Sequence, residues 1–144
     1  MSEPDRSDLD VVEISAPAAP ETLEEVQDRL AALWERRADL SPELTMRFEM
    51  GLVEILGNLI EHAYDPLSPG REVAVRIEVG ADVVTAVLSD NGKPVAVDLS
   101  RVAMPDEDAE SGRGLALALA ALDHLSYERD GDCNRWHLRC GGAA

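Results

Sequence analysis

The segment from Phe48 to Tyr64 constrains the fold more than any other part of the sequence. Apolar residues recur in it at steps of three and four, and these are Phe48, Leu52, Ile55, Leu59 and Ala63. The spacing places them on one face of an α-helix, so it predicts a helix with one side buried in a core. On a neighbouring face Glu54 and Asn58 are four residues apart, so their side chains stand one above the other along the helix.

Glu54 and Asn58 form a pair that is able to carry chemistry. A carboxylate can orient a water or a hydroxyl group, and an amide oxygen can hold a divalent cation. The alternative is a polar stripe on an ordinary amphipathic helix. The helix by itself does not separate these two interpretations, because a motif is a hypothesis until its context agrees.

The segments before and around this helix have recognisable boundaries. Ser41 is the expected cap of the long helix, with Pro42 at its first position. An earlier helix is predicted to start at a Thr22 cap and to fade near Asp39. A short strand is expected at Leu9–Ile14, followed by a stiff connector, Ala16–Pro20, which excludes helix.

The rest of the chain predicts two hairpins separated by a loop and a helix. The first hairpin pairs Val73–Val79 with Val83–Asp90, and the last pairs Leu125–Arg129 with Arg135–Cys140. Between them, Asp98–Ser111 is acidic and contains a proline, so we expect a mobile loop. Gly112-Arg113-Gly114 then leads into an expected helix, Leu115–Leu122, made of leucines and alanines.

Length and charge limit the domain organisation and the partners. The 144 residues suit a single domain, which we place at residues 9–144 after a disordered acidic tail at residues 1–8. The formal net charge of −16 disfavours direct binding to nucleic acid or to anionic membranes and favours a basic protein partner. No apolar run reaches the roughly 18 residues that span a bilayer, and the polar N-terminus is no secretory signal, so we expect a cytoplasmic protein.

The two cysteines indicate neither a disulfide nor a metal site. Cys133 and Cys140 fall on one predicted strand at positions of opposite parity. An extended strand would hold them on the order of 20 Å apart, so we expect free structural thiols.

Two glycine-containing motifs follow the long helix. Asp90-Asn91-Gly92-Lys93-Pro94 comes directly after a predicted strand, and Gly112-Arg113-Gly114-Leu115 precedes a helix. Taken alone, the first is a common turn and the second relieves backbone strain. The free amides and positive end of a helix can also receive phosphate oxygens, and Arg113 adds a permanent cation.

In this order and spacing, the three features resemble the nucleotide-binding boxes of the GHKL ATPase superfamily, which includes gyrase B and the histidine kinases. Within it, the runs Glu54–Tyr64, Asp90–Pro94 and Ser111–Leu115 are similar to those of the anti-sigma-factor serine kinases. The resemblance implies an α+β fold of two layers, in which helices cover one face of a mixed, mostly antiparallel sheet, the GHKL or Bergerat ATP-binding fold. It covers about Leu9 to Cys140.

The resemblance also implies roles, with ATP and Mg²⁺ as cofactors. Glu54 would act as the general base on a serine hydroxyl, and Asn58 would ligate Mg²⁺. Asp90 would accept a hydrogen bond from the adenine amino group. The remaining residues implied to contact or line the nucleotide site are His62, Gly92, Pro94, Gly112, Arg113, Gly114 and Leu115.

The implied function is an ATP-dependent serine protein kinase that phosphorylates an anti-sigma-factor antagonist of the STAS type and sequesters a sigma factor. Such proteins are typically homodimers that use the early sheet edge, here Leu9–Ile14. Relatives often carry a threonine near adenine on the late strand, but this chain reads Cys133-Asn134-Arg135-Trp136 there, and the sequence assigns no contact. That departure and the acidic loop leave an alternative: a catalytically weak or inactive binding module that acts by protein contact alone.

Overall fold

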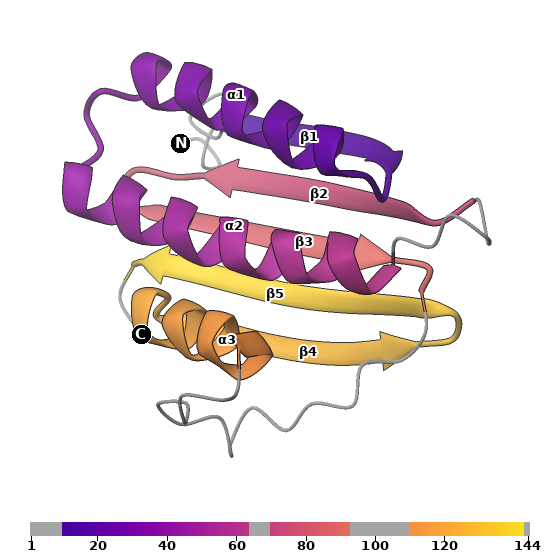
Figure 1. Ribbon diagram of the computed structural model, residues 1–144. Coiled ribbons are helices and arrows are strands. Elements are labelled where there is room, and N and C mark those ends of the chain that lie inside the picture. The colour runs from indigo at the N-terminus through magenta and orange to yellow at the C-terminus, as the bar shows by residue number, and fades with distance from the viewer. Residues whose placement is uncertain (1–9, 64–69, 93–109, 143–144) are drawn as a thin grey trace, which may run out of the picture.

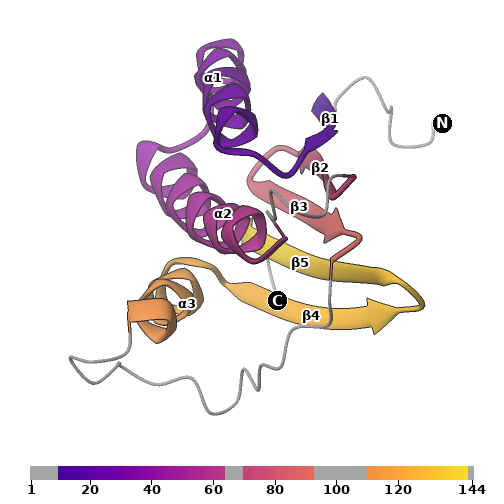
Figure 2. The same ribbon diagram turned by 45° about the vertical axis from the view of Figure 1, so that its right-hand side comes forward.

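The computed structural model describes residues 10–63, 70–92 and 110–142, which form two layers. In Figure 1 three helices lie over one face of a five-stranded sheet, and Figure 2 shows the layers from a second direction. The strands are β1 (Asp10–Pro17), β2 (Glu72–Val79), β3 (Val83–Asp90), β4 (His124–Asp130) and β5 (Cys133–Gly141). The helices are α1 (Pro20–Arg36), α2 (Pro42–Ala63) and α3 (Glu110–Ala121).

The strand order is β1-β2-β3-β5-β4, and each neighbouring pair in this list is antiparallel. The predicted two-layer α+β fold is therefore confirmed. β5 lies between β3 and β4, so the last hairpin joins the sheet beside the end of the first one. The register pairs Asp90 with Asn134, residues that are far apart in the sequence. This pairing brings the two hairpins together at the end of β3.

The core lies between the sheet and the helices, where the two sequence periodicities meet. Alternate residues of β2, β3 and β5 are buried, as period-two spacing predicts. The α2 residues Phe48, Leu52, Ile55 and Leu59 are buried against them, which confirms the predicted helix face. The side chain of Ala63 lies outside the described part.

Two local expectations at helix starts had different outcomes. Ser41 caps α2 as predicted, because its hydroxyl accepts a hydrogen bond from the Leu44 amide at 3.1 Å. Thr22 does not cap α1, so that expectation is wrong. Its hydroxyl donates to the carbonyl of Pro17 at 2.6 Å, and the helix begins two residues earlier, at Pro20.

The connector and the late helix also differ from the prediction. Ala16 and Pro17 continue β1, and Pro20 opens α1, so Ala16–Pro20 does not exclude regular structure. Proline tolerates both places because an edge strand and a first helical turn do not need its missing N–H. α3 starts at Glu110, so the motif Gly112–Gly114 lies within the helix rather than before it. The rest of the expected loop, residues 98–109, lies outside the described part.

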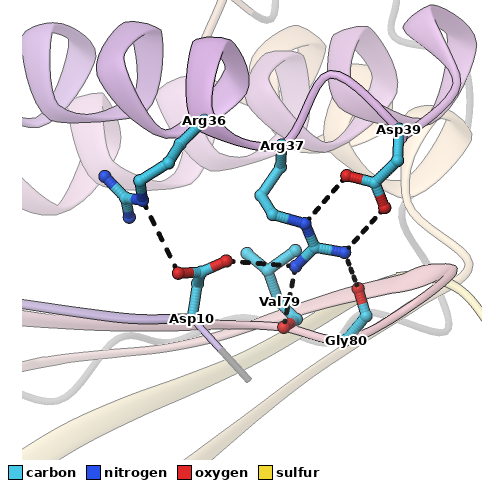
Figure 3. Close-up of polar contacts among 6 residues, drawn as sticks. All are labelled: Asp10, Arg36, Arg37, Asp39, Val79 and Gly80. Atoms are coloured by element: carbon cyan, nitrogen blue, oxygen red, sulfur yellow. Dashed lines mark hydrogen bonds and ion pairs between the residues drawn. The ribbon is translucent and has the colours of Figure 1, made fainter. Parts of the chain in front are cut away.

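Arg37 joins the end of α1 to the edge of the sheet (Figure 3). Its guanidinium donates to Asp10 at 3.2 Å, to Asp39 at 2.9 Å, and to the carbonyl oxygens of Val79 and Gly80 at 3.4 and 2.8 Å. The hydrogen bond to Asp39, together with the bond to Asp10, raises the pKa of Arg37 above its ordinary value. One side chain therefore connects α1, β1 and the turn between β2 and β3.

Both cysteines fall on the last strand, as predicted. Cys133 and Cys140 are both on β5 and both are free. Within the described ranges, each helix is too short or too polar to cross a membrane.

Candidate functional site

Glu54 and Asn58 lie where α2 packs against α3. A β-carbon placed on Gly114 would stand 2.7 Å from Glu54 Oε2 and 3.5 Å from Asn58 Nδ2. Both side chains are partly buried, so they do not project into open solvent. The absence of a side chain at Gly114 thus leaves room for a carboxylate and an amide from the neighbouring helix. The structure brings these three predicted site residues together.

Glu54 also borders an open groove between α1 and α2. The groove has a volume of about 460 Å³. Its lining residues are Gln27 and Trp34 from α1 and Thr45, Met46, Glu49, Met50, Val53 and Glu54 from α2. Glu54 therefore lines the groove, while its Oε2 atom lies against Gly114 of α3.

The far end of α3 is fixed to α2 through Arg47. Its guanidinium donates to the carbonyl oxygen of Ala121 at 3.0 Å and to Asp123 at 2.8 Å. The backbone N–H of Gly141 donates to the same Asp123 carboxylate at 2.7 Å. This hydrogen bond and the Arg47 guanidinium hold the pKa of Asp123 below its usual value. These contacts fix how α3 crosses α2 and, with it, where Gly114 sits.

Asp90 ends β3 and is almost completely buried, with 3% of its surface exposed. Its Oδ1 atom accepts hydrogen bonds from the Gly92 N–H at 2.7 Å and from Asn134 Nδ2 at 3.0 Å. Its Oδ2 atom is buried and has no hydrogen-bond partner among the described residues. A buried carboxylate oxygen without a donor is costly, so the site is suited to a ligand that brings an N–H group.

The structure adds Asn134, Arg129 and Tyr127, which sequence reasoning did not assign to the site. Asn134 is completely buried, and its Oδ1 atom accepts from the Tyr127 hydroxyl and from Arg129 Nη1 at 3.1 Å. Arg129 Nη1 also donates to the carbonyl oxygen of Gly92 at 2.7 Å. One signal was present in the sequence: Asn134 has the same strand parity as the apolar Trp136, which places an amide on the buried face.

The motif Gly112-Arg113-Gly114 lies in the first turns of α3, not in a loop before it. α3 begins at Glu110, so Gly112 is in the first turn and its N–H group has no partner within the helix. This N–H group remains available to an anion at the positive end of the helix. Leu115 packs in the hydrophobic core. Pro94 and the side chains of His62 and Arg113 lie outside the described part.

α2 and β3 run in the same direction in Figure 1, and α2 lies over β3. Asn58 is in the C-terminal half of α2, and Asp90 ends β3, so both belong to the same end of the sheet. The described residues contain no cluster of three or more His, Cys, Asp or Glu side chains that would hold a metal alone. Mg²⁺ commonly takes most of its ligands from phosphates and water, so a single protein ligand such as Asn58 is enough to hold it.

Comparison with known families gives one match that covers most of the chain. Residues 16–139 match the family described as the histidine kinase-like ATPase domain. The chain belongs to this family, which confirms the resemblance to the GHKL superfamily. A comparison with curated proteins finds no match.

Two solved structures are similar to this chain at low sequence identity. The crystal structure of the RsbU and RsbW domains of Rv1364c from Mycobacterium tuberculosis superposes with a TM-score of 0.63 and 18% identity, covering 92% of this chain and 32% of that one. The Acinetobacter baumannii histidine kinase AdeS has a TM-score of 0.47 and 19% identity, covering 90% of this chain and 67% of that one. This chain thus spans about a third of the length of the mycobacterial structure.

A histidine kinase-like ATPase domain implies a site for ATP, typically with Mg²⁺, and the residues present fit these groups. Asp90 Oδ2 is an acceptor in need of a donor, and the adenine amino group is one. Gly114 leaves open a position that a β-carbon would fill. The Asn58 amide oxygen is a hard ligand of the kind that Mg²⁺ prefers.

Proposed function

We propose that this protein is an ATP-dependent serine protein kinase that phosphorylates an anti-sigma-factor antagonist of the STAS type and also sequesters a sigma factor. The observation that carries the proposal is the contact of Glu54 and Asn58 with Gly114. It unites two of the three sequence boxes that resemble those of the anti-sigma-factor serine kinases. The likeness in fold to a structure containing an RsbW domain supports the same assignment.

The residues of the candidate site have distinct roles in binding MgATP in this proposal. Asp90 Oδ2 accepts the adenine amino group, and Gly92 lets the backbone approach the base. Asn58 holds Mg²⁺ through its amide oxygen. The first-turn N–H group of Gly112 donates to a phosphate oxygen, as helix starts do. Bound MgATP supplies the γ-phosphoryl group and the cation that offsets its charge.

Glu54 is the proposed general base. Its carboxylate takes the proton of a serine hydroxyl as the serine oxygen bonds to the γ-phosphorus and the bond from that phosphorus to the β-phosphate bridging oxygen breaks, leaving ADP. Positioning and charge neutralisation supply most of the catalysis in such transfers, so one base and one metal are enough. The groove between α1 and α2 supports the role, because it gives a protein segment a route to Glu54.

The proposed sigma-factor partner agrees with the charge of the chain. A net charge of −16 attracts a basic protein surface and repels nucleic acid. A sigma factor binds DNA, and basic surfaces suit that task. Sequestration of such a partner would not require the kinase reaction.

A transfer assay tests the proposal. The purified protein is incubated with labelled ATP, Mg²⁺ and the STAS-type antagonist encoded nearest to it, and label on a serine is the expected result. Glu54→Gln should lower the transfer rate by roughly 100-fold or more, in line with the loss of a general base. Its affinity for MgATP, measured by calorimetry, should stay within about 3-fold of the parent, because Glu54 does not hold the nucleotide in this proposal.

Glu43→Gln is the matched control, since Glu43 is an exposed carboxylate in the first turn of the same helix. It should transfer phosphate like the parent. Undiminished transfer by Glu54→Gln would contradict the proposal. Absence of nucleotide binding at millimolar ATP would favour the alternative, a module that acts by protein contact alone.

A further inference from the structure

Four residues around the end of β3 form a closed ring of hydrogen bonds. Gly92 donates its N–H to Asp90 Oδ1, and Asn134 donates its Nδ2 to the same oxygen. Arg129 then joins the other two members, because one of its nitrogens donates both to Asn134 Oδ1 and to the Gly92 carbonyl oxygen. Tyr127 adds its hydroxyl to Asn134 Oδ1 from β4. The ring links β3, the turn after it, β4 and β5.

The ring determines which way the Asn134 amide faces. An amide has a donor end and an acceptor end, and the two can exchange places by a rotation. Tyr127 and Arg129 both donate, so the acceptor end of Asn134 must face them. Its donor end therefore faces Asp90. The orientation follows from the contacts on β4 and not from Asn134 alone.

The consequence for Asp90 is a fixed carboxylate with two unlike oxygens. Oδ1 accepts two hydrogen bonds, while Oδ2 is buried without a partner among the described residues. Rotation of the carboxylate would break both bonds to Oδ1, so Oδ2 stays the oxygen without a partner. A rigid acceptor of this kind selects for a donor, because a ligand without one leaves the buried oxygen unpaired.

We infer that Asn134, held by Tyr127 and Arg129, is a positioning residue that makes Asp90 selective for a purine with an exocyclic 6-amino group. The inference rests on the proposed nucleotide site and adds the residues that set its selectivity. Asn134 acts through Asp90 and needs no contact with the nucleotide. A role restricted to packing would weaken the binding of all purine nucleotides alike.

The test compares ATP with purine riboside triphosphate, which lacks the 6-amino group but is otherwise the same. Calorimetry of the full chain with Mg²⁺ gives a dissociation constant for each nucleotide. We expect the parent to prefer ATP by on the order of 10- to 100-fold, the range for one hydrogen bond to a charged acceptor. Asn134→Ala should bring that preference to within about 3-fold, mainly by weakening ATP binding.

Tyr127→Phe keeps the test decisive if Asn134→Ala fails to fold, because it removes a single hydroxyl. It should lower the preference by a smaller factor, roughly 3-fold, with the far-ultraviolet spectrum unchanged. Arg135→Gln is the matched control, since Arg135 is next to Asn134 but on the opposite, partly exposed face of β5. It should retain the preference of the parent.

The outcomes separate this inference from the proposed function. A preference that is unchanged in Asn134→Ala and Tyr127→Phe would overturn the inference and leave the kinase proposal intact. Selective binding without phosphate transfer would support the inference and contradict the kinase proposal. In the transfer assay, Asn134→Ala should raise the KM for ATP and leave kcat within about 3-fold, as expected of a residue that positions the ground state.

Discussion

Gly114 faces Glu54 so closely that a β-carbon at position 114 would stand 2.7 Å from the Glu54 Oε2 atom. The two residues belong to different helices, α3 and α2, and are 60 positions apart in the sequence. The contact leaves the carboxylate next to a bare stretch of helix backbone. A side chain added at position 114 should therefore lower phosphate transfer without lowering the stability of the fold.

Gly114→Ala should impair phosphate transfer by roughly 10-fold or more, because the new methyl group displaces the proposed base. The fold should keep its stability or gain up to about 1 kcal/mol, since alanine favours a helix interior over glycine and the displaced group is the end of a flexible side chain. Chemical denaturation and the transfer assay measure the two effects. Gly57→Ala is the control, because a β-carbon there meets nothing within 4 Å. Loss of activity in both variants would count against the proposed contact.

Gly51→Ala should destabilise the packing of α2 against Leu122, the residue that follows α3. A β-carbon at Gly51 would stand 2.5 to 2.8 Å from three carbon atoms of the buried Leu122 side chain. Overpacking of this kind costs about 1–3 kcal/mol, so the urea midpoint should fall. The same substitution in a Leu122→Ala background should cost less, because the clashing atoms are gone. Equal costs in the two backgrounds would show that the clash is not the cause.

Arg37→Ala should lower the free energy of unfolding by about 1–3 kcal/mol, because it removes the donor to the carbonyl oxygens of the buried Val79 and Gly80 and leaves Asp10 paired with Arg36 alone. Arg37→Lys should recover little of the loss, since an ammonium group cannot bond Asp10, Asp39 and Gly80 in the fork geometry of Figure 3. Urea titration monitored by circular dichroism provides the measurement. Arg29→Ala, at an exposed position on α1, should change the midpoint very little.

The Asp123 carboxylate should contribute to stability in a manner that depends on pH. Its pKa in the folded protein is lowered by the Gly141 N–H and by Arg47. The contribution is therefore fully present above the unfolded pKa of about 3.9 and is lost as the pH falls through the lower, folded value. Asp123→Asn should flatten the fall in urea midpoint below about pH 4. Asp132→Asn, in the exposed turn of the last hairpin, is the control, and an unchanged acid profile in Asp123→Asn would refute the assignment.

Patterns local in sequence predicted most of the fold. Alternation placed β2, β3 and the last hairpin, and the three- and four-residue steps placed the buried face of α2. Ser41 was recognisable as a cap because a proline and an apolar residue follow it. Thr22 carried a similar signal but uses its hydroxyl for Pro17 instead. Pro17 comes from the preceding strand, so this contact depends on how β1 meets α1.

The residues of the candidate site likewise fall into those that local patterns predicted and those that depend on contacts between distant segments. Glu54 and Asn58 were predicted because they are on one helix, and Asp90 because it ends an apolar strand. Asn134, Arg129 and Tyr127 were not, because they reach Asp90 and Gly92 only through the pairing of β5 with β3 and β4. Strand parity indicated that Asn134 is buried, but it could not name the partner across the sheet. The start of α3 was misplaced because glycines at 112 and 114 are unfavourable within a helix and pointed to a later beginning.

The pairing of Asp90 with Asn134 has a further consequence for how this chain can vary. The two residues are 44 positions apart, yet they are register partners, so the polypeptide between them, which includes α3 and β4, begins and ends at one place in the sheet. A change in the length of this connection need not alter the register of β3 and β5. Closing a longer connection adds an entropic cost that grows only slowly with its length. Insertions or deletions between Gly92 and Glu110 should consequently be tolerated by the framework, which leaves that stretch free to diverge for new partners.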